Sequence, residues 1–199
     1  MNRITNKMLS YFYTQLCKFS EWMDEGSRSN FILLLLPALF IFFNVFVIPY
    51  FINLYGLQDH ELLDLQFGFT PEFAHAVLAD YGEYGRHGIM VFTGIVDTAY
   101  PLVYGSLLTL FISRLKMKSN ARNNSLQIIN LTPFIAVLFD LMENIGILMM
   151  IQYYPGQIIP VARVTSIAGI FKWIFLGSSV LILLFLLIRT LIYWRKGRK

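Results

Sequence analysis

The chain alternates between long apolar stretches and shorter polar segments, and four of the stretches are long enough to cross a membrane. They cover residues 31–52, 89–113, 128–151 and 161–192. A membrane-spanning helix needs about 20 predominantly apolar residues, and each stretch meets that length. The pattern predicts an all-α polytopic integral membrane protein, a four-helix bundle in which residues 1–199 form a single membrane domain.

Residues 5–26 have a different pattern, in which apolar side chains recur at helical spacing and charged ones lie around the other side. The apolar positions are Met8, Leu9, Phe12, Leu16, Phe19, Trp22 and Met23. This amphipathicity predicts an N-terminal helix that lies in the membrane interface. An extension that simply packs on the bundle is the alternative.

The connection between the first two spans, residues 53–88, is long and acidic. Within it, Thr70 can cap a helix, Pro71 suits its first turn, and Glu72 places a carboxylate near the positive end of the helix dipole. We expect a short helix over about 71–81 that ends before Gly82. It would cover the mouth of the bundle as a lid, and a solvated loop is the alternative.

Composition and charge point to a membrane protein with its termini on one side. Hydrophobic residues make up 56% of the chain and charged residues 14%, which leaves little mass for a soluble domain. Lys and Arg gather before the first span, between the second and third, and in the tail 193–199. By the positive-inside rule both termini are cytoplasmic and the loop 53–88 is outside. The short length and charge bias suit a bacterial inner membrane.

The net charge of +4 needs no nucleic acid to explain it. Basic loops of a membrane protein face anionic lipid headgroups, which are the partner that this distribution indicates. The expected partners are therefore the lipid bilayer and a small lipid-soluble molecule. No Gly-x-x-x-Gly pair predicts a dimer, so the sequence leaves open whether the protein forms a homo-oligomer or joins a larger membrane complex.

Ionisable residues interrupt three of the four spans: Asp97 in the second, Asp140 and Glu143 in the third, and Lys172 in the fourth. A charge in the hydrocarbon core costs about 2.5–3.5 kcal/mol on insertion scales, so such residues mark a functional site by default. Counting 1.5 Å per residue from the outer boundaries puts all four about 8–16 Å deep. They can therefore meet.

Helical spacing places further polar side chains beside these charges. The expected catalytic residues are Asp97, Asp140 and Glu143, and the expected ligand-binding residues are Asn44, Tyr100, Tyr104, Asn144, Arg163 and Lys172. Three carboxylates that face at most two cations leave a charge mismatch, which a dry site does not tolerate cheaply. One carboxyl is then protonated, or the pocket holds water, a cation or a positively charged ligand.

The favoured interpretation is a pocket that binds a small lipid-soluble or amphiphilic molecule, with acid–base conversion of that molecule as the reaction these residues can support. Whether a reaction occurs is left open. A proton-coupled carrier is one alternative. Another is an accessory or scaffold subunit of a larger complex, in which the polar residues serve only as interhelical glue.

The chain lacks the sequence motifs of several common kinds of catalytic or metal site. His60, His75 and His87 occur without His-Glu-x-x-His or paired-cysteine spacing, so we predict no metal site. There is no phosphate-binding glycine loop, no nucleophile elbow and no cysteine with a histidine partner. The sequence names no cofactor and no substrate.

Overall fold

The computed structural model describes residues 2–119 and 127–196, and every regular element among them is helical. Four helices are long and apolar enough to cross a membrane: Asn30–Leu54, Gly82–Lys118, Ile129–Tyr153 and Ile159–Arg195. The chain is therefore built as a multi-pass membrane protein. The middle of the second loop and the last three residues of the basic tail lie outside the described residues.

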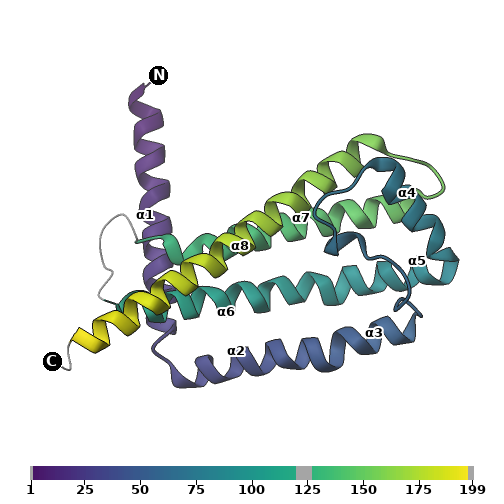
Figure 1. The fold of residues 1–199 in the computed structure, drawn as a ribbon. Coiled ribbons are helices and arrows are strands. Elements are labelled where there is room, and N and C mark those ends of the chain that lie inside the picture. The colour runs from purple at the N-terminus through teal and green to yellow at the C-terminus, as the bar shows by residue number, and fades with distance from the viewer. Residues whose placement is uncertain (1, 120–126, 197–199) are drawn as a thin grey trace.

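The helices and their bounds are as follows. They are α1 (Asn2–Gly26), α2 (Asn30–Phe42), α3 (Ile48–Leu54), α4 (Pro71–Asp80), α5 (Gly82–Val91), α6 (Asp97–Lys118), α7 (Thr132–Tyr153) and α8 (Ile159–Lys196). Short 3-10 turns occur at Leu63–Leu65 and Ile129–Leu131. Figure 1 shows α4 and α5 at one end of the bundle, and α1 with the end of α8 at the other.

Two of the spans contain a π-helical turn, Phe43–Val47 between α2 and α3 and Phe92–Val96 between α5 and α6. The first turn is followed by Pro49 and the second by Pro101. Proline removes a backbone donor and disturbs the preceding turn, so irregular hydrogen bonding beside it is expected. The freed carbonyls need other donors, because lipid supplies none.

The spans differ greatly in the fraction of their residues that is buried. In the most apolar window of Asn30–Leu54 no residue is buried, whereas 44% and 50% of residues are buried in Gly82–Lys118 and Ile129–Tyr153. Helices α7 and α8 pack along a common seam, where Phe139 stacks on Phe171 and Phe175 at centroid distances of 5.0 and 5.8 Å. The protected interior therefore lies among α6, α7 and α8.

Helix α4 covers one end of this interior. Thr70 accepts a hydrogen bond from the Phe73 N–H at 3.2 Å, which fixes the start of the helix. Ala74, Val77 and Leu78 are buried in a cluster with Ile147, Met150, Ile151 and Ala162 from α7 and α8. Gly82, with φ of +61°, allows the sharp change of direction into α5.

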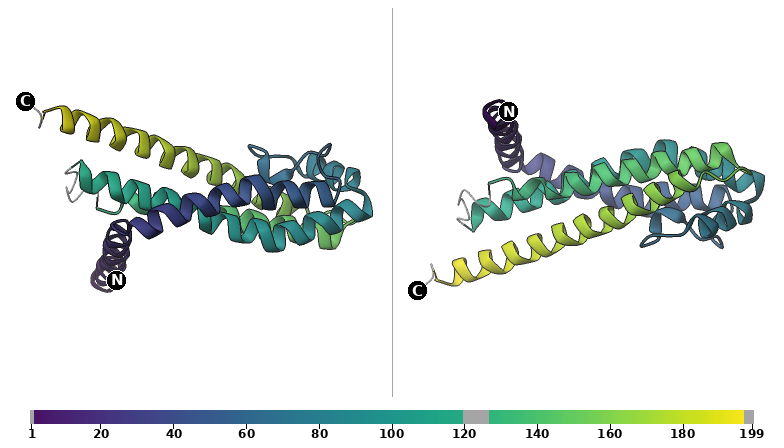
Figure 2. Two further views of the ribbon diagram at one scale, coloured as in Figure 1. Left: turned by 90° about the horizontal axis from the view of Figure 1, so that it is seen from below. Right: turned by 90° about the horizontal axis from the view of Figure 1, so that it is seen from above.

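Helix α1 runs crosswise to the long helices, and its first turns project beyond them (Figure 1). Met8, Leu9 and Phe12 on these turns are exposed, whereas Ser20 and Met23 near its end are buried against the bundle. The two views of Figure 2 show that α8 separates from its neighbours toward its C-terminal end. The other ends of the long helices stay together beneath α4 and α5.

Candidate functional site

Lys172 stands at the centre of the buried charges. Its Nζ lies 2.6 Å from Glu143 Oε2 and 3.8 Å from Asp140 Oδ1, so it pairs closely with the first and more loosely with the second. Glu143 is completely buried, and Lys172 and Asp140 are each 5% exposed. The depth count from the sequence placed these three residues within reach of one another, and the fold brings them together.

Gly169 is what allows α7 and α8 to meet at this point. A Cβ atom at Gly169 would collide with Glu143 Oε1, so the carboxylate occupies the space that a side chain would otherwise take. About one turn farther along the seam, a Cβ at Gly146 would collide with the side chain of Thr165. Glycines at both positions therefore let a charged side chain fit between closely packed helices.

Helix α6 contributes Tyr104 and Asp97. The Tyr104 hydroxyl donates to Asp140 Oδ2 at 2.7 Å. Asn144 Nδ2 donates to the backbone carbonyl of Asp97 at 2.7 Å. That carbonyl would normally accept from the N–H four residues ahead, where Pro101 has none, so Asn144 replaces the missing helical donor. The Asp97 side chain is buried and lies within electrostatic range of Asp140 and Lys172.

A residue that the sequence did not point to, Asp64, completes the site from the loop between α3 and α4. Lys172 Nζ donates to the Asp64 backbone carbonyl at 2.6 Å. Burial raises the pKa of the Asp64 carboxyl above its ordinary value, and the nearby Lys172 ammonium opposes that rise. The only sequence signal is that Asp64 lies within the apolar run Leu62, Leu63, Leu65, which is unusual for a solvated loop.

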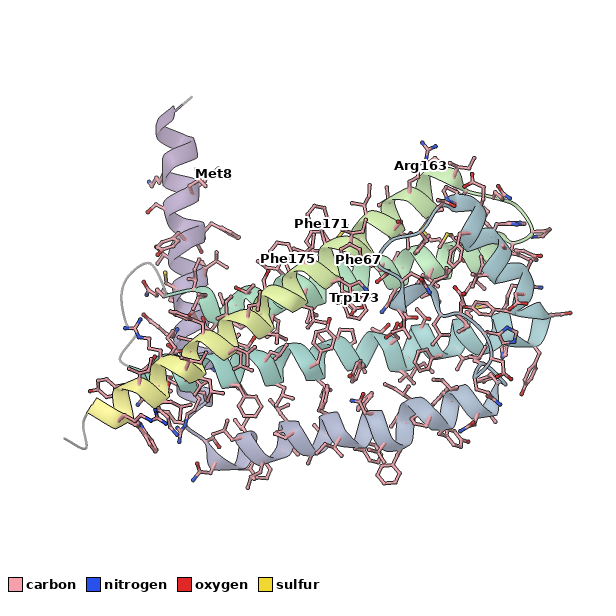
Figure 3. The ribbon with its side chains drawn as sticks, in the orientation of Figure 1. Met8, Phe67, Arg163, Phe171, Trp173 and Phe175 are labelled. Atoms are coloured by element: carbon pink, nitrogen blue, oxygen red, sulfur yellow. The ribbon has the colours of Figure 1, made fainter. Side chains whose placement is uncertain are left out.

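The same loop is held against α8 on either side of this contact. The Phe69 N–H donates to Ser166 Oγ at 2.7 Å, and Gly68, with φ of +82°, lies directly against Ile170. Figure 3 shows Phe67 of this loop beside α8, with Trp173 on the side of α8 that faces α6. The loop therefore packs into the bundle instead of remaining a solvated connection.

Asn44 and Tyr100 form a pair at the edge of the site. Asn44 Nδ2 donates to the Tyr100 hydroxyl at 3.1 Å and to the Phe40 carbonyl at 2.7 Å. The Tyr100 ring contacts Tyr104 edge-on at a centroid distance of 5.6 Å. Asn44 is exposed on the surface of the bundle, so this predicted ligand-binding residue lies at the edge of the site.

Arg163 is not among the residues that the fold brings together. Its side chain is exposed and points away from the bundle (Figure 3). It lies near Glu72, whose pKa is lowered chiefly by a backbone N–H at the start of α4, then by the Thr70 hydroxyl, with a smaller contribution from Arg163. Helical spacing placed Arg163 outward of Lys172 on α8, and its direction around that helix takes it out of the site.

The charge mismatch is therefore larger than the sequence indicated. The carboxyl groups of Asp64, Asp97, Asp140 and Glu143 share a single amine, Lys172, within the part of the chain that the structure describes. Several buried acceptors also have no hydrogen-bond donor there: Asp97 Oδ2, Asp140 Oδ1, Glu143 Oε1 and Asn144 Oδ1. A buried polar group without a partner costs about 1–3 kcal/mol, so four in one place call for an explanation.

A second polar network, near α1, provides the contrast. Lys116 Nζ lies 2.9 Å from Asp24 Oδ2 and donates to the Gln127 carbonyl at 3.0 Å. Asn130 donates to Ser113 Oγ at 2.7 Å and accepts from Ser20 at 2.7 Å. None of the side-chain atoms of these residues is left buried without a partner. This network ties α1 to α6 and α7 and has the properties of structural glue.

The histidines do not join either network. His60 Nδ1 lies 2.7 Å from Asp80 Oδ2, and His75 Nε2 lies 3.1 Å from the Pro155 carbonyl, both near α4. Across residues 2–119 and 127–196, no three His, Cys, Asp or Glu side chains lie close enough together to hold a metal ion.

Comparison with known proteins adds no further constraint. No family model, no curated protein and no solved structure matches this chain. The chemistry of the site therefore has to be argued from its own residues.

Proposed function

We propose that the buried site around Lys172 binds a small lipid-soluble or amphiphilic molecule within the membrane. Asp97, Asp140 and Glu143 are the groups that would contact its polar part, and Tyr104 and Asn144 would orient them. Because carboxyl groups with unequal surroundings can serve as acid and base, the same site could support proton transfer to and from the bound molecule.

The observation that supports this proposal is the contrast between the two polar networks. The network of Ser20, Asp24, Lys116 and Asn130 has donors and acceptors that match, as residues kept for packing should. The site around Lys172 has an excess of acid and several acceptors without donors. A bound molecule that brings donors would supply what the protein side chains do not.

The proposal includes an arrangement in the membrane. Both termini would face the cytoplasm of a bacterial inner membrane, with α4 and α5 at the outer surface, as the distribution of Lys and Arg favours. Helix α1 would lie in the inner interface with Met8, Leu9 and Phe12 toward the acyl chains, since it runs crosswise to the spans and exposes an apolar face.

The test is to extract the full chain with its native lipids in polymer-bounded discs and identify small molecules that co-purify, by mass spectrometry. The wild-type protein should retain a molecule that the double variant Asp140→Asn, Glu143→Gln loses. The matched control, Asp59→Asn with Glu83→Gln, makes the same charge change at exposed positions and should retain it. Because Asp64 and Asp97 still face Lys172, the double variant should remain folded.

Two results would overturn the proposal. If the wild-type protein carries nothing that the site variant lacks, no ligand is held there. If the site variant also loses its thermal stability while the control does not, the charges serve packing alone.

A proton-coupled carrier is the second candidate, and one observation favours it. Lys172, Asp140 and Tyr104 form a series of ionisable groups from α8 through α7 to α6, with a hydrogen bond between Tyr104 and Asp140 and an ion pair of 3.8 Å between Asp140 and Lys172. Proton flux in proteoliposomes that is lost on Asp140→Asn would support the carrier, and flat pH traces would exclude it.

A further inference from the structure

A groove on the lipid-facing surface runs along the seam between α7 and α8, at the end of the bundle beneath α4. Its volume is about 350 Å³, and it is lined by Met142, Ile145, Gly146, Met149, Val164 and Thr165 among others. Ile145 and Val164 are more than half exposed, so lipid can reach the groove directly. Ligand pockets usually have volumes of about 300–1,000 Å³, and this groove lies at the lower end of that range.

The groove ends beside the buried charges. Its wall residue Gly146 follows Glu143 by one helical turn, or about 4.5 Å along the axis. Its wall residue Thr165 precedes Gly169, the residue against which the Glu143 carboxylate packs, by one turn. Gly146 and Thr165, which are in direct contact, therefore form both a wall of the groove and the part of the seam about one turn from the Glu143 carboxylate.

The side of the site that faces the loop between α3 and α4 is covered. Lys172 Nζ donates a hydrogen bond to the Asp64 carbonyl at 2.6 Å, and Ser166 Oγ accepts one from the Phe69 N–H at 2.7 Å. A ligand that came from that side would have to break both contacts. Entry from the groove leaves the loop in place, and the groove is open to molecules already dissolved in the bilayer. To reach the carboxylate, a ligand that enters there has to part the Gly146–Thr165 contact.

The unpaired atoms of the site define the head group. Asp97 Oδ2, Asp140 Oδ1, Glu143 Oε1 and Asn144 Oδ1 accept hydrogen bonds when the carboxyls are ionised, and Trp173 Nε1 beside Lys172 is an unpaired donor. Unpaired acceptors outnumber unpaired donors there, so the site suits a ligand that brings N–H or O–H donors. An anionic head group would add charge to a site that already has four carboxyls and one amine. The described residues offer no three side chains placed to share a metal ion, which disfavours a bare cation in place of an organic group.

We propose that the groove and the buried site together bind a single-chain amphiphile, with its hydrocarbon chain in the groove and a hydrogen-bond-donating, non-anionic head group at Glu143 and Asp97. This inference rests on the proposed function and adds to it the class of ligand and the side from which the ligand arrives. A long-chain alcohol and a long-chain amine share this chemistry.

Trp173 provides a local reporter of occupancy. Its ring centroid lies 5.2 Å from Lys172 Nζ, whereas Trp22 and Trp194 are 64% and 56% exposed at the opposite end of the bundle. The chain has three tryptophans, so Trp22→Phe with Trp194→Phe leaves Trp173 alone. The fluorescence of this variant in phosphatidylcholine nanodiscs is titrated with dodecanol, dodecylamine and dodecanoate.

The expected result is a saturable change in Trp173 emission with dodecanol or dodecylamine, and none with dodecanoate. Val164→Phe, which fills the groove, should raise the concentration for half-saturation about tenfold, the effect of roughly 1.4 kcal/mol of lost binding. The matched control is Val180→Phe, also lipid-facing on α8 but two to three turns beyond Lys172, which should leave the titration unchanged.

Other results separate the failure of this inference from that of the proposed function. If Val164→Phe has no effect, but Glu143→Gln abolishes the response, the groove is not the chain site and the buried pocket stands. If dodecanoate binds as well as the other two, the assigned head-group class is wrong. A response to none of the three probes, or one that Glu143→Gln does not alter, contradicts both proposals.

Discussion

A single proline in α6 determines what Asn144 does. Pro101 has no N–H, which leaves the Asp97 carbonyl without its helical donor. Asn144 Nδ2 donates a hydrogen bond to that carbonyl instead, at 2.7 Å. In lipid no water can do this instead. The side-chain amide therefore holds the backbone at Asp97 and leaves its own oxygen free at the site.

This relation predicts a rescue between two residues. Asn144→Ala should lower the free energy of unfolding by about 1–3 kcal/mol, because it leaves a buried carbonyl unpaired. In a Pro101→Ala background the new backbone N–H can serve that carbonyl, so the same substitution should cost at least about 1 kcal/mol less. Thermal unfolding of the four proteins in one detergent measures the difference. Equal costs in both backgrounds would show that the Asp97 carbonyl is not what Asn144 stabilises.

At the scale of the element, α8 has to satisfy different requirements along its length. Its 38 residues reach about 57 Å, well beyond the roughly 30 Å of a hydrocarbon core, so it must tilt or project from the membrane. One part packs closely on α7 and supplies Gly169 and Lys172. The part toward the C-terminus separates from the bundle, as Figure 2 shows, and has looser neighbours.

Two glycines of α8 predict opposite outcomes for the same substitution. Gly169→Ala places a methyl group on the Glu143 carboxylate, which is fully buried and has no water to move into, so stability should fall by about 1–3 kcal/mol. At Gly177 a Cβ meets nothing within 4 Å. Gly177→Ala should therefore leave stability unchanged or raise it by up to about 1 kcal/mol, through helix propensity. Chemical unfolding in mixed micelles compares them, and equal losses would mean that α8 tolerates no added volume anywhere.

At the scale of the whole molecule, the fold separates a network of matched hydrogen bonds at one end from the unbalanced charges farther along the bundle. The paired network of Lys116, Asp24 and Asn130 anchors α1 across the ends of α6 and α7. The unbalanced charges lie farther along the bundle, covered by the loop that carries Asp64.

The proposed orientation can be tested with the sole cysteine removed. In a Cys17→Ser background, Glu83→Cys on α5 and Glu25→Cys on α1 place single thiols at exposed positions near opposite ends of the bundle. A membrane-impermeant maleimide applied to intact cells should label the first thiol and reach the second only after permeabilisation. The reverse pattern would mean that the termini face outward.

Local chemistry explains what could be predicted from the sequence. The four apolar stretches and the cap at Thr70 depend on neighbouring residues, so they are visible without the fold. The depth of Asp140, Glu143 and Lys172 follows from counting a regular rise per residue. The direction of Arg163 also follows from the sequence, because nine residues at 3.6 per turn put it about half a turn around α8 from Lys172. Its expected place at the site was therefore wrong, and its side chain is exposed.

The sequence by itself determined that this is a helical membrane protein with acidic groups and one lysine at similar depth in its spans. Only the tertiary structure decided which of these groups meet. Asp64 enters the site because a distant loop packs on α8, and Asn144 turns to Asp97 because α6 lies beside α7. These contacts join residues far apart in the chain, and their free energy depends on packing across helices, which no local pattern records.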